Sequence, residues 1–180
     1  MRILVTGTSG SGKTTLGKRL GAELGLPYVE LDAINWQPGW RGLDKDDPPE
    51  FLRRVDEATA GDGWVCDGNY GGARGMLWRR ATHLVWLDYG RSTIMRRVIG
   101  RSFLRAIDQR ELWAGNREDW RHWLRASHPI RWAWDTWERR RADYELRLKQ
   151  PEHAHLKVFR LTRTREAVGL GGRIRGDWTD

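Results

Sequence analysis

The stretch "GTSGSGKTT" runs from Gly7 to Thr15 and has the residue types of a phosphate-binding loop. Gly7 is followed by four residues and then by Gly12, Lys13 and Thr14, which is the spacing of a P-loop. Glycines let backbone N–H groups turn inward at a helix N-terminus, where an anion is favoured. Lys13 can then reach the β- and γ-phosphates of a nucleotide, and the Thr14 hydroxyl can bind Mg²⁺. The residues predicted to hold the nucleotide in this loop are Gly7, Ser9, Gly10, Ser11, Gly12, Lys13, Thr14 and Thr15.

A second group of residues that could do chemistry is a set of arginines in the middle of the chain. Arg97, Arg101 and Arg105 are spaced four residues apart, so on a helix they share one face. Residues 91–147 contain 14 Arg and no Lys against 8 Asp and Glu, in a chain whose formal net charge is +8. Arginines on a closing lid, expected at about residues 101–128, stabilise the charge of a phosphoryl group in transfer. The alternative is a basic helix face that meets only solvent.

These residues need strands and helices to position them, and the chain alternates between the two. Apolar runs predict five strands, at residues 2–7, 26–32, 64–70, 81–88 and 155–161. Helices are predicted from the phosphate loop to Gly25, from Pro48 to Gly61, over residues 91–107 and over residues 129–148. Ile94, Val98 and Ile99 define the apolar face of the third of these helices. Apolar strands separated by helices indicate an α/β fold in three layers, with a parallel sheet covered on both faces.

In such a sheet, ligands bind at the carboxyl ends of the strands. The predicted strand ends are Gly7, Asp32, Asp67 and Asp88. Three carboxylates are therefore expected to point toward the phosphate loop. Each of them could instead cap the turn that follows its strand.

The length and composition indicate a single domain over residues 1–180, with a loose tail at residues 171–180. The only cysteine, Cys66, lies in an apolar run and is interpreted as part of the core. The sequence has no apolar run long enough for a membrane span and no signal-like start, so we expect a cytoplasmic protein without a membrane partner.

Several classes of P-loop protein are disfavoured by motifs that the sequence lacks. It has no "NKxD"-type guanine-reading motif and no "LSGGQ"-like run of a transporter ATPase. At 180 residues it is also too short for the additional subdomain of ring-forming ATPases. A small phosphotransferase is the class that remains.

The chain resembles the small P-loop kinases of the adenylate-kinase-like fold, and among them the bacterial topology modulation or adenylate-kinase-related proteins. The motifs that resemble this group are "GTSGSGKTTLGKRLGAELGLPYVELDAINWQPGW", "WVCDGNY", "HLVWLD" followed by "MRRVIGR", and "VFRLTRTRE". Together they extend over roughly residues 1–168. The resemblance implies a three-layer fold with a five-stranded parallel sheet of order 2-3-1-4-5, an Arg-rich lid, and ATP with Mg²⁺ as the phosphate donor.

The resemblance also implies roles for individual residues. Asp32 is similar to a residue that faces the acceptor, and Asp67 to the carboxylate that holds the Mg²⁺ shell together with Thr14. Arg97 and Arg101 match arginines that enter the lid. The catalytic residues are thus expected to be Lys13, Asp32, Asp67, Arg97 and Arg101, with Arg101, Arg105 and Arg163 as further ATP contacts.

One departure from the family pattern affects the acceptor. In "DGNY", Asn69 and Tyr70 replace the Phe-Pro pair of adenylate kinases, and no Arg follows directly. The clamp that adenylate kinases place on the AMP phosphate is therefore missing here, or moved to Arg74 or Arg80. Either outcome disfavours AMP as the acceptor.

The chain contains 12 tryptophans, some of them near the expected site. Trp36 and Trp40 adjoin the acceptor segment, and Trp113, Trp120 and Trp123 flank the lid, where aromatic rings among arginines could stack on a base. Trp134 and Trp137 fall on a helical stripe and are interpreted as core.

Two other functions compete with a Mg-ATP-dependent kinase that acts on a small acceptor. One is a nucleic-acid-binding regulator in which ATP biases a switch, although no reading module is present and the basic residues alternate with acidic ones. The other is an ATPase that needs no acceptor.

Overall fold

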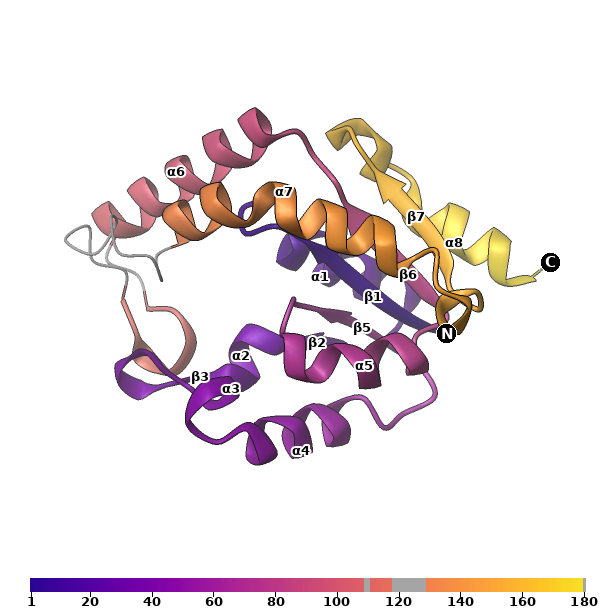
Figure 1. Ribbon diagram of the computed structural model, residues 1–180, viewed down its shortest axis with the longest axis horizontal. Helices are drawn as coiled ribbons and strands as arrows, with labels where there is room; N and C mark the ends of the chain where they lie inside the picture. The colour runs from indigo at the N-terminus through magenta and orange to yellow at the C-terminus, as the bar shows by residue number, and fades with distance from the viewer. Residues whose placement is uncertain (109–110, 118–128, 180) are drawn as a thin grey trace.

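The computed structural model describes residues 1–108, 111–117 and 129–179 of the chain. At its centre is a parallel sheet of five strands in the order β2-β5-β1-β6-β7 (Figure 1). The strands are β1 (Arg2–Gly7), β2 (Tyr28–Glu30), β5 (Trp64–Asp67), β6 (His83–Leu87) and β7 (Lys157–Leu161). Numbered among themselves along the chain, these strands have the order 2-3-1-4-5. The predicted α/β fold and its strand order are confirmed.

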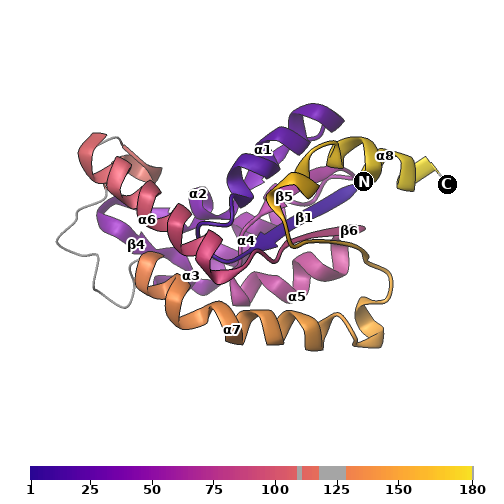
Figure 2. The ribbon, with the colours of Figure 1, turned by 90° about the horizontal axis from the view of Figure 1, so that it is seen from above.

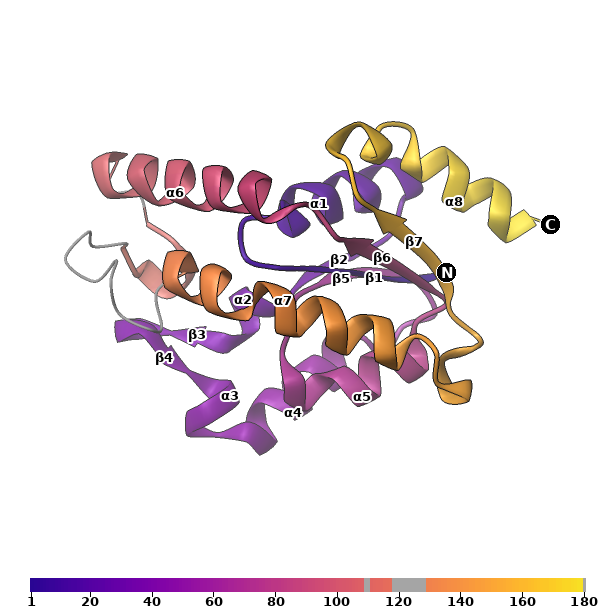
Figure 3. The same ribbon diagram turned by 45° about the horizontal axis from the view of Figure 1, so that its top comes forward.

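Helices cover both faces of the sheet, as two further views show (Figures 2 and 3). One face packs against α1 (Lys13–Leu24), α6 (Arg91–Asp108) and α8 (Leu170–Thr179). The other packs against α4 (Pro48–Ala58), α5 (Gly71–Arg80) and α7 (Pro129–Arg147). The strands β1, β5 and β6 therefore send alternate side chains into two separate cores, with Ile3 and Val5 on one side and Leu4 on the other.

Short elements join β2 to α4. They are α2 (Leu31–Asn35), the two-stranded antiparallel pair β3 (Trp36–Gln37) and β4 (Arg41–Gly42), and α3 (Leu43–Asp46). Short 3-10 turns occur at Pro38–Trp40, Trp113–Gly115, Pro151–His153 and Thr164–Ala167.

Local sequence signals explain where the main helices begin and end. Gly25 ends α1 in the left-handed conformation with φ of 67°, which glycine adopts without strain. Asp47 precedes the two prolines of α4, and its carboxylate accepts a hydrogen bond of 3.2 Å from the Glu50 N–H.

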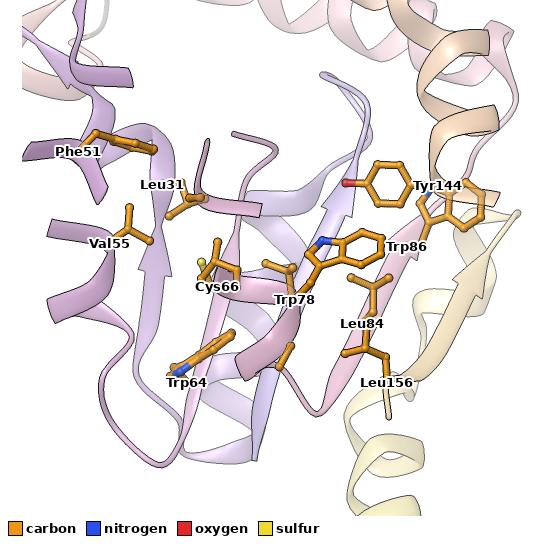
Figure 4. Packing of buried hydrophobic residues seen from close by; sticks show 14 of the residues in the cluster. Leu31, Phe51, Val55, Trp64, Cys66, Trp78, Leu84, Trp86, Tyr144 and Leu156 are labelled. Carbon is orange, nitrogen blue, oxygen red and sulfur yellow. The ribbon is translucent and has the colours of Figure 1, made fainter. Parts of the chain in front are cut away.

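The core under α4, α5 and α7 is rich in aromatic side chains (Figure 4). Trp64, Trp78, Trp86 and Tyr144 are all at most 4% exposed. Cys66 is fully buried in the same core, and burial raises the pKa of its thiol, so the structure agrees with the interpretation of Cys66 as part of the core.

Some expectations about elements are wrong. β2 ends at Glu30, two residues before Asp32, because Leu31 begins α2. Residues 170–179 form α8 rather than a loose tail, because Leu170 and Ile174 are fully buried on one helix face. Ile99 is 45% exposed and Trp134 is 52% exposed, so neither belongs to the core.

None of the helices in the described part of the chain combines the length and the apolar character that crossing a membrane requires.

Candidate active site

The phosphate loop connects β1 to α1 at the carboxyl edge of the sheet, as predicted. Gly7, Gly10 and Gly12 have φ of 151°, 83° and 93°, which L side chains rarely adopt. A Cβ on Gly12 would meet no atom closer than Arg97 Nη1 at 3.8 Å, so this part of the loop is open. The loop is also the N-terminus of α1, where backbone N–H groups and the helix dipole favour an anion. These features fit a phosphate group.

Lys13 lies over this loop. Its Nζ donates to the carbonyl oxygen of Gly7 at 3.0 Å and to that of Thr8 at 3.4 Å. Burial lowers the pKa of the Lys13 ammonium, while the negative charges of Asp67 and Asp32 act in the opposite direction. An incoming phosphate would add negative charge beside this partly buried ammonium group, whose hydrogen bonds to the loop go to uncharged carbonyl oxygens.

Thr14 and Asp67 form the pair that the sequence predicted as the Mg²⁺ site. The Thr14 hydroxyl donates to Asp67 Oδ2 at 2.8 Å, and Asp67 is 3% exposed. Burial raises the pKa of the Asp67 carboxyl to about 6, although Lys13 and the Thr14 hydroxyl act to lower it.

The chemistry of this pair fits Mg²⁺, which prefers hard oxygen ligands. Within the described residues, no group of three or more His, Cys, Asp or Glu side chains could hold a metal. An ion at Thr14 and Asp67 would therefore complete its coordination with phosphate oxygens and water, as in P-loop enzymes.

Of the three α6 arginines that were predicted to share one helix face, two reach the phosphate loop. Arg97 Nη1 donates to the Ser11 carbonyl at 3.0 Å and its Nη2 donates to Thr164 Oγ1 at 2.8 Å. Arg101 Nη2 donates to Ser9 Oγ at 3.3 Å. The guanidinium carbon of Arg105 instead lies 5.8 Å from the ring centroid of Trp113. The shared helix face therefore extends from the loop toward the acceptor side.

The segment after β7 adjoins this arginine face through Thr164. Arg163 itself has an exposed side chain, and its backbone N–H donates to Glu166 Oε2 at 3.1 Å. Its predicted contact with ATP stays a prediction.

On the predicted acceptor side, Asp32 lies in the first turn of α2 and not at a strand end. The Tyr70 hydroxyl donates to Asp32 Oδ1 at 2.6 Å. Burial raises the pKa of Tyr70, and Asp32 raises it further, so the tyrosine stays a neutral donor. Asp32 is thus oriented by a residue of the "DGNY" run.

Arg74 and Arg80, the two alternatives for a phosphate clamp, have other partners. Arg74 pairs with Asp143 of α7 at 2.8 Å. Arg80 contacts Asp56 and Thr59 at the C-terminal end of α4 and is not part of the site.

Asp88 lines a small cavity together with Gly7 and Thr8, but its carboxylate is held by arginines of β7 and α7. Its Oδ2 accepts hydrogen bonds from Arg160 Nε at 2.8 Å and Arg160 Nη2 at 2.5 Å, and it lies 3.4 Å from Arg141 Nε. This buried carboxylate stabilises the packing of β7 and α7.

Sequence reasoning missed two contributors to the site from separate parts of the chain. Asn69 contacts the phosphate loop directly, because its Nδ2 donates to the Gly7 carbonyl. Arg140 of α7 lines a small cavity together with Gly7 and Thr8, and its charge acts to lower the pKa of Lys13. The Arg content of residues 129–148 was the available signal for Arg140, but only the packing of α7 selects which arginine faces the loop.

The tryptophans near the predicted acceptor segment lie where the β3–β4 hairpin contacts residues 113–116. Trp36 and Trp40 pack edge to face at 5.4 Å between centroids. Asn116 Oδ1 accepts from the backbone N–H of Trp40 at 2.9 Å, and Trp113 Nε1 donates to Glu30 Oε1 at 3.0 Å. Within the predicted lid, residues 101–108 belong to α6, and residues 111–117 pack on the hairpin of β3 and β4. The rest of the predicted lid, residues 109–110 and 118–128 with Trp120 and Trp123, lies outside the described residues.

Comparison with known proteins supports the kinase fold. A shikimate kinase from Acinetobacter baumannii in complex with shikimate superposes with a TM-score of 0.59 and 17% identity, covering 99% of this chain and 92% of that one. A deoxyadenosine kinase from M. mycoides gives a TM-score of 0.58 at 12% identity, covering 99% of both chains. A gluconokinase from Sinorhizobium meliloti 1021 gives 0.53 at 18% identity, covering 99% of this chain and 95% of that one.

Sequence matches are much shorter. A shikimate kinase from Bacteroides fragilis is 56% identical over 32 residues, which make up 18% of this chain and 18% of that protein. No model of a known protein family matches the chain. The adenylate-kinase-like and topology-modulation resemblances therefore stay predictions, while the superpositions show that this chain has the α/β fold of the P-loop kinases.

Proposed function

We propose that the protein is a Mg-ATP-dependent phosphotransferase that transfers the γ-phosphoryl group of ATP to a hydroxyl of a small acceptor. The observation that supports this most is the convergence of Lys13, the Thr14–Asp67 pair and two α6 arginines on one phosphate loop. Bound Mg²⁺ would neutralise charge on the phosphates at Thr14 and Asp67. The cationic side chains are placed to stabilise the additional charge that develops during transfer.

Asp32 is the proposed acceptor-side residue. Tyr70 occupies its Oδ1, and its Oδ2 accepts no hydrogen bond from the residues that the structure describes. That oxygen is available to orient an acceptor hydroxyl and to accept its proton during transfer.

The acceptor is proposed to be a small hydroxyl compound or nucleoside rather than AMP. Arg74 is paired with Asp143, and no arginine directly follows "DGNY", so the phosphate clamp of adenylate kinases is not reproduced. Solved proteins of this fold include kinases named for shikimate, gluconate and deoxyadenosine, all of which bear hydroxyl groups.

The proposal is tested by following ADP release from Mg-ATP by the purified protein, alone and with nucleosides, nucleoside monophosphates, hydroxy acids, sugars and short DNA. We expect one class of small hydroxyl acceptor to raise turnover by orders of magnitude. Lys13→Ala should lower that turnover at least ~100-fold, the scale for loss of one transition-state donor. Slow release that no acceptor accelerates would indicate an ATPase, and acceleration by DNA alone would indicate a nucleic-acid-dependent switch.

A further inference from the structure

The two carbonyl groups that hold Lys13 each have a second hydrogen-bond donor. The Gly7 carbonyl accepts from Lys13 Nζ at 3.0 Å and also from Asn69 Nδ2. The Thr8 carbonyl accepts from Lys13 Nζ at 3.4 Å and also from the Ser11 N–H at 3.1 Å. A carbonyl oxygen has two lone pairs and can accept both donors at once.

Asn69 is held in this orientation by Tyr144 of α7. The Tyr144 hydroxyl donates to Asn69 Oδ1 at 3.0 Å. Tyr144 is 3% exposed, and its ring lies 5.5 Å from that of Trp78 and 5.4 Å from that of Trp86, between centroids (Figure 4). Because the amide oxygen is occupied by Tyr144, the amide nitrogen is directed to the phosphate loop.

The second donors matter when Lys13 changes partners. To contact a nucleotide phosphate, the Lys13 ammonium must leave the carbonyls of Gly7 and Thr8. Gly7 is buried, and a buried carbonyl left without a donor destabilises the state in which this occurs. Asn69 keeps the Gly7 carbonyl paired after Lys13 leaves, just as the Ser11 N–H keeps the Thr8 carbonyl paired.

We propose that Asn69, oriented by Tyr144, is a positioning residue that lowers the free-energy cost of moving Lys13 from the loop carbonyls to the nucleotide phosphate. This inference rests on the proposed function, since it assumes that the loop binds a nucleotide. It assigns a role to the asparagine of "DGNY" in donor binding rather than in acceptor recognition.

The test is calorimetric binding of MgADP and of adenosine to the full-length protein. Asn69→Ala should weaken MgADP binding by about 10-fold, which corresponds to about 1.4 kcal/mol. Adenosine affinity should not change, because adenosine has no phosphate to recruit Lys13. Tyr144→Phe keeps the ring packing and should weaken MgADP binding by about 3-fold, since it loosens the amide without removing it.

A double-mutant cycle separates this role from a structural one. In a Lys13→Ala background, MgADP binding removes no lysine from the carbonyls of Gly7 and Thr8. Asn69→Ala should therefore leave the MgADP affinity of that variant unchanged. Thr59→Ala is the matched control, because it removes a buried hydroxyl that bonds the Val55 carbonyl and Arg80 at the far end of α4. It should bind MgADP as the wild type does.

Each other outcome identifies what is wrong. Failure of the wild-type protein to bind MgADP would reject the proposed function itself. Wild-type binding that Asn69→Ala does not weaken would reject the role of Asn69. If Asn69→Ala weakened the binding of MgADP and of adenosine equally, Asn69 would only maintain the structure. The same conclusion would follow if Asn69→Ala weakened MgADP binding equally with and without Lys13.

Discussion

At the scale of single residues, Asp67 shows how the site combines chemistry with a cost in stability. Its carboxyl is buried beside Thr14, and its pKa is raised to about 6. Because the folded state holds this proton more tightly than the unfolded state, Asp67 destabilises the fold above pH 6 and does not do so below about pH 4. A buried charge that costs stability is expected where function requires it.

Replacing Asp67 with asparagine therefore has opposite effects on stability and activity. Asp67→Asn keeps an acceptor for the Thr14 hydroxyl and should stabilise the protein at pH 8 by up to about 3 kcal/mol. At pH 4 the two proteins should be equally stable, and phosphoryl transfer should be lost at every pH. Thermal and denaturant unfolding at both pH values measure this. Equal stability of the two proteins at pH 8 would mean that the Asp67 charge costs the fold nothing.

At the scale of secondary-structure elements, α6 connects the phosphate loop to the proposed acceptor side. Arg97 and Arg101 contact the loop, whereas Arg105 lies over Trp113. Spacing alone predicted that the three arginines share one helix face. Spacing could not show that two of these arginines contact the phosphate loop and the third contacts Trp113, because those contacts depend on how α6 lies across the sheet edge.

This division predicts unequal effects of two matched substitutions. Arg101→Ala should lower kcat by about 100-fold with a smaller change in the KM for ATP, because Arg101 contacts the loop that we propose holds the transferred group. Arg105→Ala removes the same charge one turn further along and should lower kcat by less than about 10-fold. Steady-state kinetics with saturating acceptor test this. Equal losses in both variants would contradict the assignment of Arg101 to the loop.

Elements with strong local signals were predictable, and those without them were not. The P-loop, α1 and the buried strands have motifs, caps or unbroken apolar runs. Residues 71–80 contain Gly71, Gly72 and Gly75, which disfavour a helix, and α5 forms because Ala73, Leu77 and Trp78 are buried against the sheet. α8 is similarly glycine-rich, and it is stabilised by tertiary packing rather than by propensity.

The packing of α8 gives a stability prediction. Ile174 is fully buried against the core of α1 and β1, so Ile174→Ala should destabilise the protein by about 2–4 kcal/mol. Val168, which is 74% exposed just before the helix, provides the control, and Val168→Ala should change stability by less than about 0.5 kcal/mol. Urea unfolding compares them. An Ile174→Ala protein as stable as the wild type would indicate that α8 is not part of the folded core.

At the scale of the whole molecule, residues 111–117 connect α6 to the segment that we propose as the acceptor side of the site. Asn116 Nδ2 donates to the Gln37 carbonyl at 2.9 Å, and its Oδ1 accepts from Trp40. These contacts join distant parts of the chain, so neither motifs nor periodicity could predict them. The same holds for Asn69 and Arg140, whose roles depend on where β5 and α7 meet the phosphate loop.

Loss of the Asn116 hydrogen bonds should raise the KM for the acceptor more than the KM for ATP. Asn116→Ala removes the hydrogen bonds to Gln37 and Trp40 and should raise the KM for the acceptor by about 5-fold, with the KM for ATP changed less than 2-fold. Kinetics with each substrate varied in turn measure both values. Equal changes in the two KM values would show that the contact supports the fold generally and not the acceptor side.

We propose that the phosphoryl group goes to a small hydroxyl compound. The most direct measurement is ³¹P NMR of Mg-ATP incubated with the protein and a mixture of small hydroxyl metabolites, with Lys13→Ala in parallel. We expect a new phosphomonoester resonance that grows in step with ADP in the wild-type sample and is absent from the variant. ADP accompanied only by an equal amount of inorganic phosphate would contradict it.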